Sequence, residues 1–210
     1  MQRREMSIEL ESGSLPGILM VPPDPAGVVA FAHGSGSSRH SPRNRQVADG
    51  LAGAGFATLL FDLLTDAESR DRGNVFDIAL LGRRLGTAVD RLGEEPALAD
   101  LPVGLFGAST GAAAALDAAA SRAGPVSAVV SRGGRPDLAT RPQDVTCPVL
   151  LVVGSEDGPV IGMNEDAAAR LGGPVELELV EGAGHLFEGP GQLEEVTELA
   201  IGWFRRHLST

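Results

Sequence analysis

Short apolar runs alternate with longer stretches of mixed polarity along most of this chain. The runs that we interpret as strands lie at 27–33, 56–64, 103–106, 126–131, 149–154 and 175–180. Most of them are nearly continuous in Val, Leu, Ala and Phe, which is typical of strands covered on both faces of a parallel sheet. Two earlier segments, 7–11 and 15–21, flank Gly13 and predict an antiparallel hairpin at a sheet edge.

Helical patterns separate these runs. Apolar residues recur with a helical period between Ile78 and Val89, which predicts a helix over 75–92. Further helices are expected over 42–54, 112–120, 161–171 and 192–208. The polar stretch 65–74 is expected to be a loop, and Trp203 is expected to fill the core. Strands that alternate with helices indicate an α/β fold, a mostly parallel sheet with helices on both faces. No internal repeat or long linker interrupts the pattern, so we expect one domain over residues 1–210.

Composition narrows the class of protein and of partner. The length of 210 residues suits one domain with a sizeable core. The formal net charge of −11 argues against nucleic acid or an anionic membrane as partner, because phosphate binding requires a basic surface. No signal peptide or membrane-spanning run is visible, and we therefore expect a cytoplasmic location. Cys147 is the only cysteine, which excludes an internal disulfide, and we expect a small buried side chain there.

One motif suggests nucleophilic chemistry. Gly107-Ala-Ser-Thr-Gly111 is a G-x-S-x-G that follows the run 103–106 and precedes the Ala-rich segment 112–120. Strand, tight turn and helix form the context of a nucleophile elbow, in which strained backbone presents the serine at the top of a sheet. We therefore take Ser109 as the candidate nucleophile.

A serine hydroxyl needs a base, and the base needs an acid that fixes its tautomer. Of the histidines, His185 follows the last predicted strand and therefore lies at the carboxyl edge of the sheet, where the elbow also opens. The acid is expected from the loop after the run 149–154. Asp157 is our choice, and the neighbouring Glu156 stays open as an alternative. Of the other three histidines, His207 is expected at the solvated surface of the last helix, His40 lies in a polar loop, and His33 ends a predicted strand and opens the Gly-rich turn.

Backbone N–H groups at this edge can stabilise the oxyanion of acyl transfer. We expect one donor from Thr110, directly after the nucleophile. The second is expected from the Gly-rich turn after His33, with Ser35 first and Gly36 behind it. Arg132 also lies at this edge, where it could clamp an acidic group of a substrate. The competing interpretation of Arg132, and of nearby Arg135, is a loop-fixing hydrogen bond or a surface ion pair.

Taken as a set, these residues resemble the α/β-hydrolase fold, specifically its small dienelactone-hydrolase-like branch. The segments that carry the resemblance are Phe31-Ala-His-Gly-Ser-Gly-Ser-Ser, Gly107-Ala-Ser-Thr-Gly, Gly154-Ser-Glu-Asp and Gly184-His185. Serine, acid and histidine follow one another in the order of that fold. The resemblance implies Ser109 as nucleophile, Asp157 as acid and His185 as base. Many members of the fold carry a lid, but only about fifteen residues separate the strand that ends near Ser131 from the next, too few for a cap domain. We expect no cofactor and no metal. Dienelactone hydrolase itself carries a cysteine nucleophile where this chain has serine, which puts that substrate in doubt.

We therefore expect a serine hydrolase that cleaves small or soluble carboxylic esters or lactones through an acyl-enzyme on Ser109. An acyltransferase or thioesterase on the same residues is the first alternative, and a non-catalytic binding module is the second. A similar bacterial subgroup includes members fused to a phosphoribosyltransferase domain, for which these 210 residues show no counterpart. A homodimer through an exposed sheet edge is left open.

Overall fold

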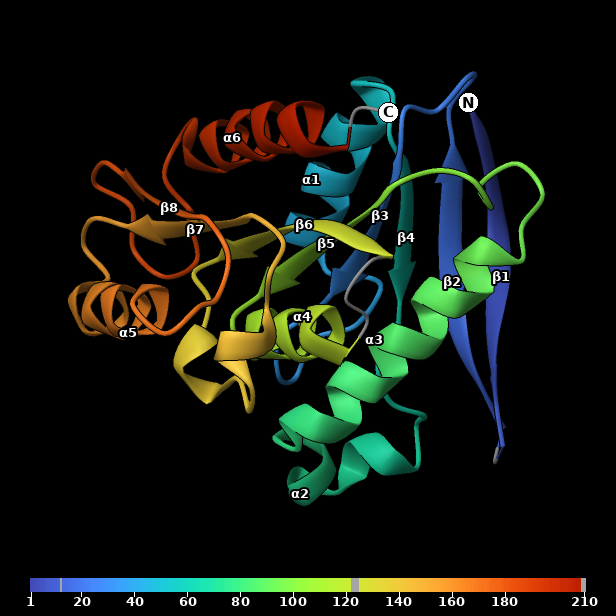
Figure 1. Ribbon diagram of the computed structural model, residues 1–210, viewed down its shortest axis with the longest axis horizontal. Helices are drawn as coiled ribbons and strands as arrows, with labels where there is room; N and C mark the ends of the chain where they lie inside the picture. The colour runs from blue at the N-terminus through green and yellow to red at the C-terminus, as the bar shows by residue number, and fades with distance from the viewer. Residues whose placement is uncertain (12, 122–124, 209–210) are drawn as a thin grey trace.

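A single sheet of eight strands organises the computed structural model of the chain, which describes residues 1–11, 13–121 and 125–208 (Figure 1). Its strand order is β1-β2-β4-β3-β5-β6-β7-β8. The strands are β1 (Gln2–Leu10), β2 (Gly13–Val21), β3 (Val28–Ala32), β4 (Ala57–Phe61), β5 (Val103–Ala108), β6 (Val126–Arg132), β7 (Val149–Gly154) and β8 (Val175–Val180). The mostly parallel α/β architecture predicted from the sequence is confirmed.

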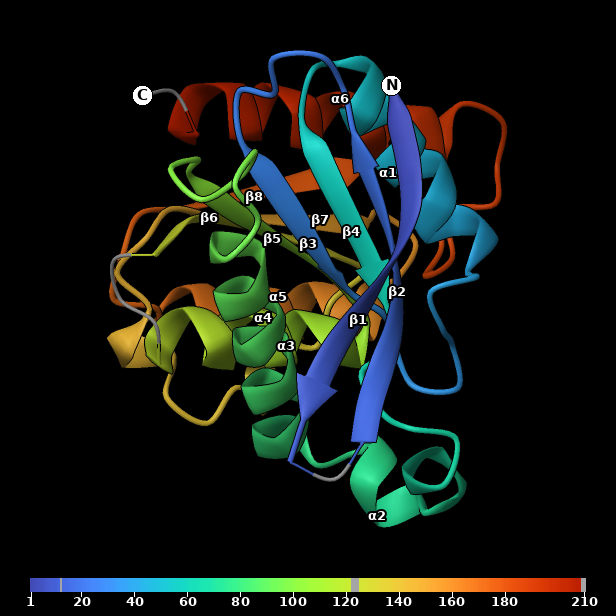
Figure 2. The same cartoon turned by 90° about the vertical axis from the view of Figure 1, so that its right-hand side faces the viewer.

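The antiparallel part of the sheet lies at one edge. Strands β1 and β2 form a hairpin, and β2 pairs antiparallel with β4. Both strands begin earlier than the segments 7–11 and 15–21 indicated, whereas β1 ends at Leu10 and β2 ends at Val21 as predicted. The turned view in Figure 2 shows the hairpin as a long twisted ribbon. From β4 through β8 every pairing is parallel, so the carboxyl ends of these strands meet along one edge.

Helices cover both faces of the sheet (Figure 1). The helices are α1 (Pro42–Gly53), α2 (Arg72–Val75), α3 (Ile78–Gly93), α4 (Thr110–Ser121), α5 (Gly158–Ala168) and α6 (Gln192–His207). Helices α3, α4 and α5 lie on one face, and α1 and α6 lie on the other. The two short segments η1 (Glu68–Arg70) and α2 occupy the stretch 65–74 that the sequence assigned to a loop. That assignment was wrong because the capping side chain of Asp71 starts a helical turn despite the polar composition.

Two apolar clusters hold the layers together. On one face the small residues of α4 let it lie close against the sheet and against α3. On the other face Phe56, Trp203 and Phe204 pack between the sheet and the helices α1 and α6. Trp203 is 1% exposed, so it fills the core as predicted. Strands β3, β4, β5 and β7 are buried along their whole length, as expected from their continuous apolar sequences.

The carboxyl edge of the sheet stays open. Between β6 and β7, the structure places only the single turns η2 (Pro136–Leu138) and η3 (Pro142–Asp144), too little for a cap. Within the described ranges no helix combines the length and the apolar character that a membrane crossing requires.

Candidate active site

Ser109 lies at the sharp turn between β5 and α4. Its φ of 52° lies in the left-handed region, which is costly for a residue other than glycine. A Cβ at Gly107 would lie 2.4 Å from Cα of Ala112, and a Cβ at Gly111 would lie 2.2 Å from the carbonyl oxygen of Ala32. The two glycines of the motif therefore allow strand and helix to approach this closely, and the side chain between them remains partly exposed.

The strained residue is held from β6. The N–H of Ser109 donates to the carbonyl of Arg132 at 3.2 Å. The N–H of Arg135 donates to the carbonyl of Ser109 at 3.0 Å. These two bonds continue the β5–β6 pairing past the end of the strands, and they fix the direction in which the hydroxyl leaves the sheet.

His185 and Asp157 form a close pair beside this turn. Nδ1 of the imidazole lies 2.7 Å from Oδ2 of Asp157. Asp157 precedes α5, but its carboxylate makes no capping hydrogen bond and so is available to the imidazole. Glu156 is exposed. Because Nδ1 faces the carboxylate, Nε2 is the ring nitrogen left for a proton from a nucleophile.

Contacts between two loops bring this pair together. The loops follow the neighbouring parallel strands β7 and β8. The N–H of Glu156 donates to the carbonyl of Ala183 at 2.9 Å, and the N–H of Gly182 donates to Oγ of Ser155 at 2.8 Å. A Cβ at Gly154 would lie 2.1 Å from the carbonyl oxygen of Ala183, so this approach requires glycine. The loops are thus packed rigidly against each other at their base.

Ser109 and His185 line one cavity of about 260 Å³. Its described lining residues are Gly34, Ser35, Ser37, Ser41, Arg43, Asn44, Ala108, Ser109, Arg132, Gly133, His185 and Leu186. None of these is acidic, and two are arginines. The arginines are therefore the only permanently charged side chains among these lining residues, in a protein whose net charge is strongly negative.

The expected oxyanion donors lie beside this cavity. Thr110 opens α4, and backbone N–H groups in the first turn of a helix have no partner within the helix. The N–H of Ser35 donates to Oγ1 of Thr110 at 2.9 Å, so it is already engaged. Gly36, with φ of 70°, instead lines a neighbouring cavity of about 140 Å³. The roles assigned to these residues stay predictions.

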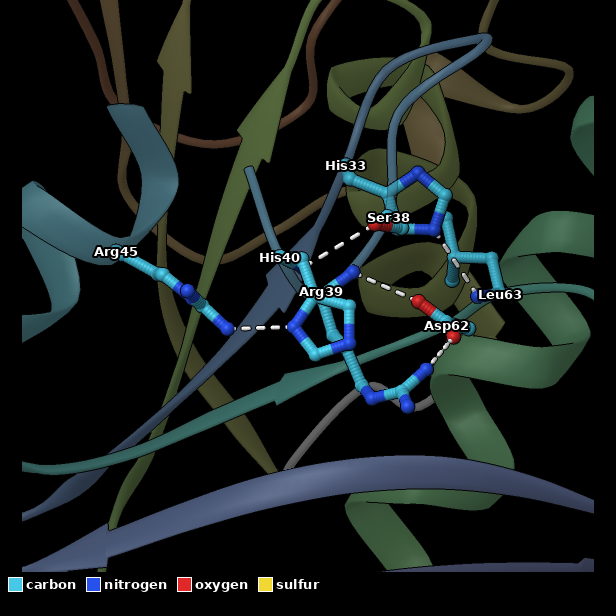
Figure 3. Close-up of polar contacts among 7 residues, drawn as sticks. All are labelled: His33, Ser38, Arg39, His40, Arg45, Asp62 and Leu63. Carbon is cyan, nitrogen blue, oxygen red and sulfur yellow. Dashed lines mark hydrogen bonds and ion pairs between the residues drawn. The ribbon is translucent and has the colours of Figure 1, made fainter. Parts of the chain in front are cut away.

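The Gly-rich turn is anchored by the end of β4, as Figure 3 shows. The ring of His33 contacts the carbonyl of Gly34 through Nδ1 at 3.0 Å and accepts from the N–H of Leu63 through Nε2 at 3.2 Å. Asp62 accepts from both the backbone and the guanidinium of Arg39. His33 is therefore structural, and burial lowers its pKa from the ordinary value.

Arg132 and Arg135 have different surroundings. The guanidinium of Arg135 binds Asp137 through two hydrogen bonds of 2.8 Å, which is the ion pair that the sequence left open. Arg132 is 8% exposed, and its Nε and Nη1 have no hydrogen-bond partner among the described residues. Burial and the nearby charge of Arg43 lower the pKa of Arg132 to about 10, so it remains charged at neutral pH.

Several lining residues escaped the sequence analysis. Arg43 and Asn44 lie in the first turn of α1, which reaches the cavity only through the packing of α1 beside α6. Asn164 of α5, which is not among the lining residues, also escaped the sequence analysis. Its Nδ2 donates to the carbonyl of Gly134 at 3.0 Å and so holds the loop after β6. The only available signal was Ser41 followed by Pro42, which indicates a helix start but not what that start faces.

Among the described residues, no group of three or more His, Cys, Asp and Glu is gathered as a metal site would require.

Comparison with known proteins places this geometry in a family. A family model described as serine aminopeptidase, S33, matches residues 23–135, which include the elbow. The crystal structure of a dienelactone hydrolase from Anabaena variabilis is 51% identical, with a TM-score of 0.95 over 99% of this chain and 98% of that one. The chain belongs to the α/β-hydrolase family, within its dienelactone-hydrolase-like branch.

Other relatives are informative about coverage and fold. A protein of Mycobacterium tuberculosis, provisionally named a phosphoribosyl transferase, is 56% identical over 98% of this chain. The match spans 47% of that protein, so the chain corresponds to about half the length of this curated relative. Est1E from Butyrivibrio proteoclasticus shares the fold at 17% identity and a TM-score of 0.80, over 96% of this chain and 98% of its own.

Proposed function

We propose that this α/β hydrolase is a serine esterase that cleaves small, soluble carboxylic esters or lactones. Ser109 attacks the carbonyl while His185 takes the hydroxyl proton through Nε2, and Asp157 stabilises the imidazolium. The acyl group is then bound to Oγ of Ser109, and the alcohol leaves with the proton that His185 returns. Water, activated by the same imidazole, hydrolyses the acyl-enzyme and restores the serine.

The observation that carries this proposal is the 2.7 Å contact between Asp157 and His185 beside a cavity that Ser109 also lines. An imidazole with its Nδ1 on a carboxylate is oriented to act as a base through Nε2. The positive φ of Ser109 supports the same function, because such strain is kept where it presents a reactive group. The small, uncapped cavity favours short acyl groups over long lipid chains.

The backbone around Ser109 supplies candidate donors for the oxyanion. The N–H of Thr110 lies in the first turn of α4, where backbone donors have no partner within the helix. We place Ser35 as the second donor, which requires its N–H to turn from the Thr110 hydroxyl towards the substrate or to be shared between the two.

The test is covalent labelling combined with substitution. A fluorophosphonate probe is expected to label the wild-type protein on Ser109, and hydrolysis of p-nitrophenyl acetate is expected to be lost in Ser109→Ala. Ser131→Ala is the matched control, because Ser131 is a buried serine of β6 outside the cavity lining. Hydrolysis that persists in Ser109→Ala would refute the assignment. If the wild-type protein neither reacts with the probe nor hydrolyses any short ester, a non-catalytic module becomes the better account.

The acceptor of the acyl group separates hydrolysis from transfer on the same residues. An open cavity admits alcohols and thiols as well as water. Supplying a range of alcohols and thiols with a short ester, and measuring the ratio of free acid to new ester or thioester, distinguishes the two. We expect the free acid to predominate.

The name of the M. tuberculosis relative does not change this proposal. That protein is about twice as long as the matched region, and its provisional name refers to the whole of it. The residues that we use here, Ser109, Asp157 and His185, suit acyl chemistry.

A further inference from the structure

Arg132 is a buried cation whose guanidinium is not fully paired among the residues that the structure describes. Its side chain is nine-tenths buried, and both Nε and Nη1 lack a hydrogen-bond partner among the described residues. None of the ion pairs found in the described part of the chain includes it. Removing a guanidinium from water without a counter-charge is unfavourable, and buried arginines are normally paired.

Other arginines near the site show what pairing looks like in this protein. Arg39 binds Asp62, and Arg135 binds Asp137 through both oxygens of the carboxylate. With 28 acidic residues in the chain, a carboxylate opposite Arg132 would be an ordinary arrangement. No acidic residue is among the described residues that line the cavity, so the lining supplies no counter-charge for Arg132.

The geometry directs this charge into the active-site cavity. Arg132 ends β6 and pairs with Ala108, the residue before the nucleophile. The side chain of its neighbour Ser131 lies towards Gly134 and Ala112 on the α4 side. Consecutive residues of a strand point to opposite faces, so Arg132 points to the face covered by α1 and α6 and lines the cavity there.

The other groups on this side of the cavity reinforce the positive potential. Arg43 also lines the cavity, although one of its nitrogens lies 3.5 Å from Glu188 at the surface. Its charge is close enough to lower the pKa of Arg132. The N-terminus of α1, capped by Ser41, adds a partial positive charge.

We propose that Arg132, assisted by Arg43, binds an oxyanion group of the substrate, so that the preferred esters are anionic. This inference rests on the proposed esterase function and specifies its substrate class. The bound group is a carboxylate or a phosphate on the acyl or the alcohol part of a short ester or lactone. A guanidinium donates two parallel hydrogen bonds to either group, and the oxyanion supplies the counter-charge that the cavity lacks.

Kinetics with a matched pair of esters tests the proposal. The mono-4-nitrophenyl ester of succinic acid carries a free carboxylate, and its methyl ester is the neutral counterpart. We expect wild-type KM to be lower for the anionic ester by at least about tenfold. Arg132→Gln should remove this preference, and the quantity compared is the ratio of the two KM values within each variant. Arg132→Lys should keep part of the preference.

Arg141→Gln is the control for net charge. It removes one positive charge from an exposed side chain that pairs with Asp144, away from the cavity. Its preference for the anionic ester should equal that of wild type. If Arg132→Gln impairs both esters equally, or wild type shows no preference, the subsite does not exist. Should Arg132→Gln fail to fold, a preference in Arg132→Lys as large as that of wild type would count against the proposal, because a lysine cannot make the two parallel hydrogen bonds of a guanidinium.

Anion binding separates this proposal from the failure of the esterase function. In Ser109→Ala, titration calorimetry with succinate and with inorganic phosphate measures the subsite without any turnover. Binding of either ion that weakens at least about tenfold on adding Arg132→Gln supports the subsite even if no ester is cleaved, and the tighter ion identifies the oxyanion. If neither ion binds in an Arg132-dependent way while wild type cleaves neutral esters, the subsite is refuted and the esterase stands.

Discussion

The backbone N–H of Ser35 donates to the side-chain hydroxyl of Thr110, with 2.9 Å between nitrogen and oxygen. This bond ties the Gly-rich turn after β3 to the residue that follows the nucleophile. The two residues expected to supply oxyanion donors are thus held relative to each other by one of their own side chains. We therefore expect the separation of the two proposed oxyanion donors to depend on that hydroxyl.

Substituting Thr110 tests this dependence. Thr110→Val keeps the shape of the side chain but removes the acceptor, and a lost hydrogen bond of about 1 kcal/mol corresponds to roughly a five- to tenfold fall in kcat. Thr110→Ser keeps the hydroxyl and should remain within about twofold of wild type. The measurement is kcat for p-nitrophenyl acetate. Equal kcat values for the Val and Ser variants would show that the bond has no influence on catalysis.

The choice between two adjacent carboxylates gives a second prediction. Asp157→Asn leaves the loop intact but removes the charge that faces Nδ1 of His185, and we expect kcat to fall about 10²- to 10⁴-fold. Glu156→Gln changes an exposed neighbour and should leave kcat within about twofold. Steady-state kinetics on both variants decides between the two carboxylates. A larger loss in Glu156→Gln than in Asp157→Asn would reverse the assignment.

Cys147 is expected to be chemically inert. Burial raises the pKa of its thiol to about 11, so at pH 8 only about one molecule in a thousand carries the reactive thiolate. Iodoacetamide at this pH should leave ester hydrolysis unchanged, and Cys147→Ala should retain wild-type activity. If iodoacetamide inactivated the wild-type protein but not Cys147→Ala, the thiol would be shown to matter for activity.

Much of the fold was predictable because the strands of this sheet are short and buried. A continuous apolar run such as that of β7 has few other uses, and the Gly residues at 107 and 111 identify the elbow. Boundaries were less certain. The helix expected at 161–171 begins at Gly158, because Pro159 suits the first turn of a helix and Asp157 precedes it.

The finer details of the site were not predictable from local sequence. Asp157 and Glu156 are adjacent carboxylates on one turn, and the backbone direction at that turn decides which of them faces the imidazole. Arg43 reaches the cavity only because α1 packs beside α6, far from it in sequence. The lack of a partner for Arg132 is likewise a property of the folded protein, since the sequence is rich in carboxylates.

Gly111, two residues after the nucleophile, gives a prediction on stability. Gly111→Ala would place a Cβ 2.2 Å from a backbone oxygen of β3, which cannot move without disturbing the sheet. We expect a loss of about 1–3 kcal/mol in the free energy of unfolding. Gly162→Ala, in α5 with no atom within 4 Å of the new Cβ, should be neutral or stabilising by up to about 1 kcal/mol. Urea unfolding of both variants measures the difference, and equal stabilities would contradict the close approach.

His33 makes stability depend on pH in a defined direction. Burial lowers its pKa below the ordinary value of 6.5, whereas in the unfolded chain the ring titrates near that value. Between 6.5 and the lowered pKa the unfolded state therefore binds more protons. The free energy of unfolding should fall as the pH drops through this window, and the contribution of His33 to it should be complete above the window.

Urea unfolding of wild type and of His33→Gln, each at about pH 7.5 and about pH 5, measures this dependence. His33→Gln should show a smaller loss of stability between the two pH values than wild type, whatever its absolute stability. His40→Gln is the matched control, because that ring lies on the same turn but is exposed, beside the side chain of Arg45, and its loss should leave the dependence unchanged. A wild-type dependence that survived in His33→Gln would show that other groups cause it, and the buried ring would then have no part in acid sensitivity.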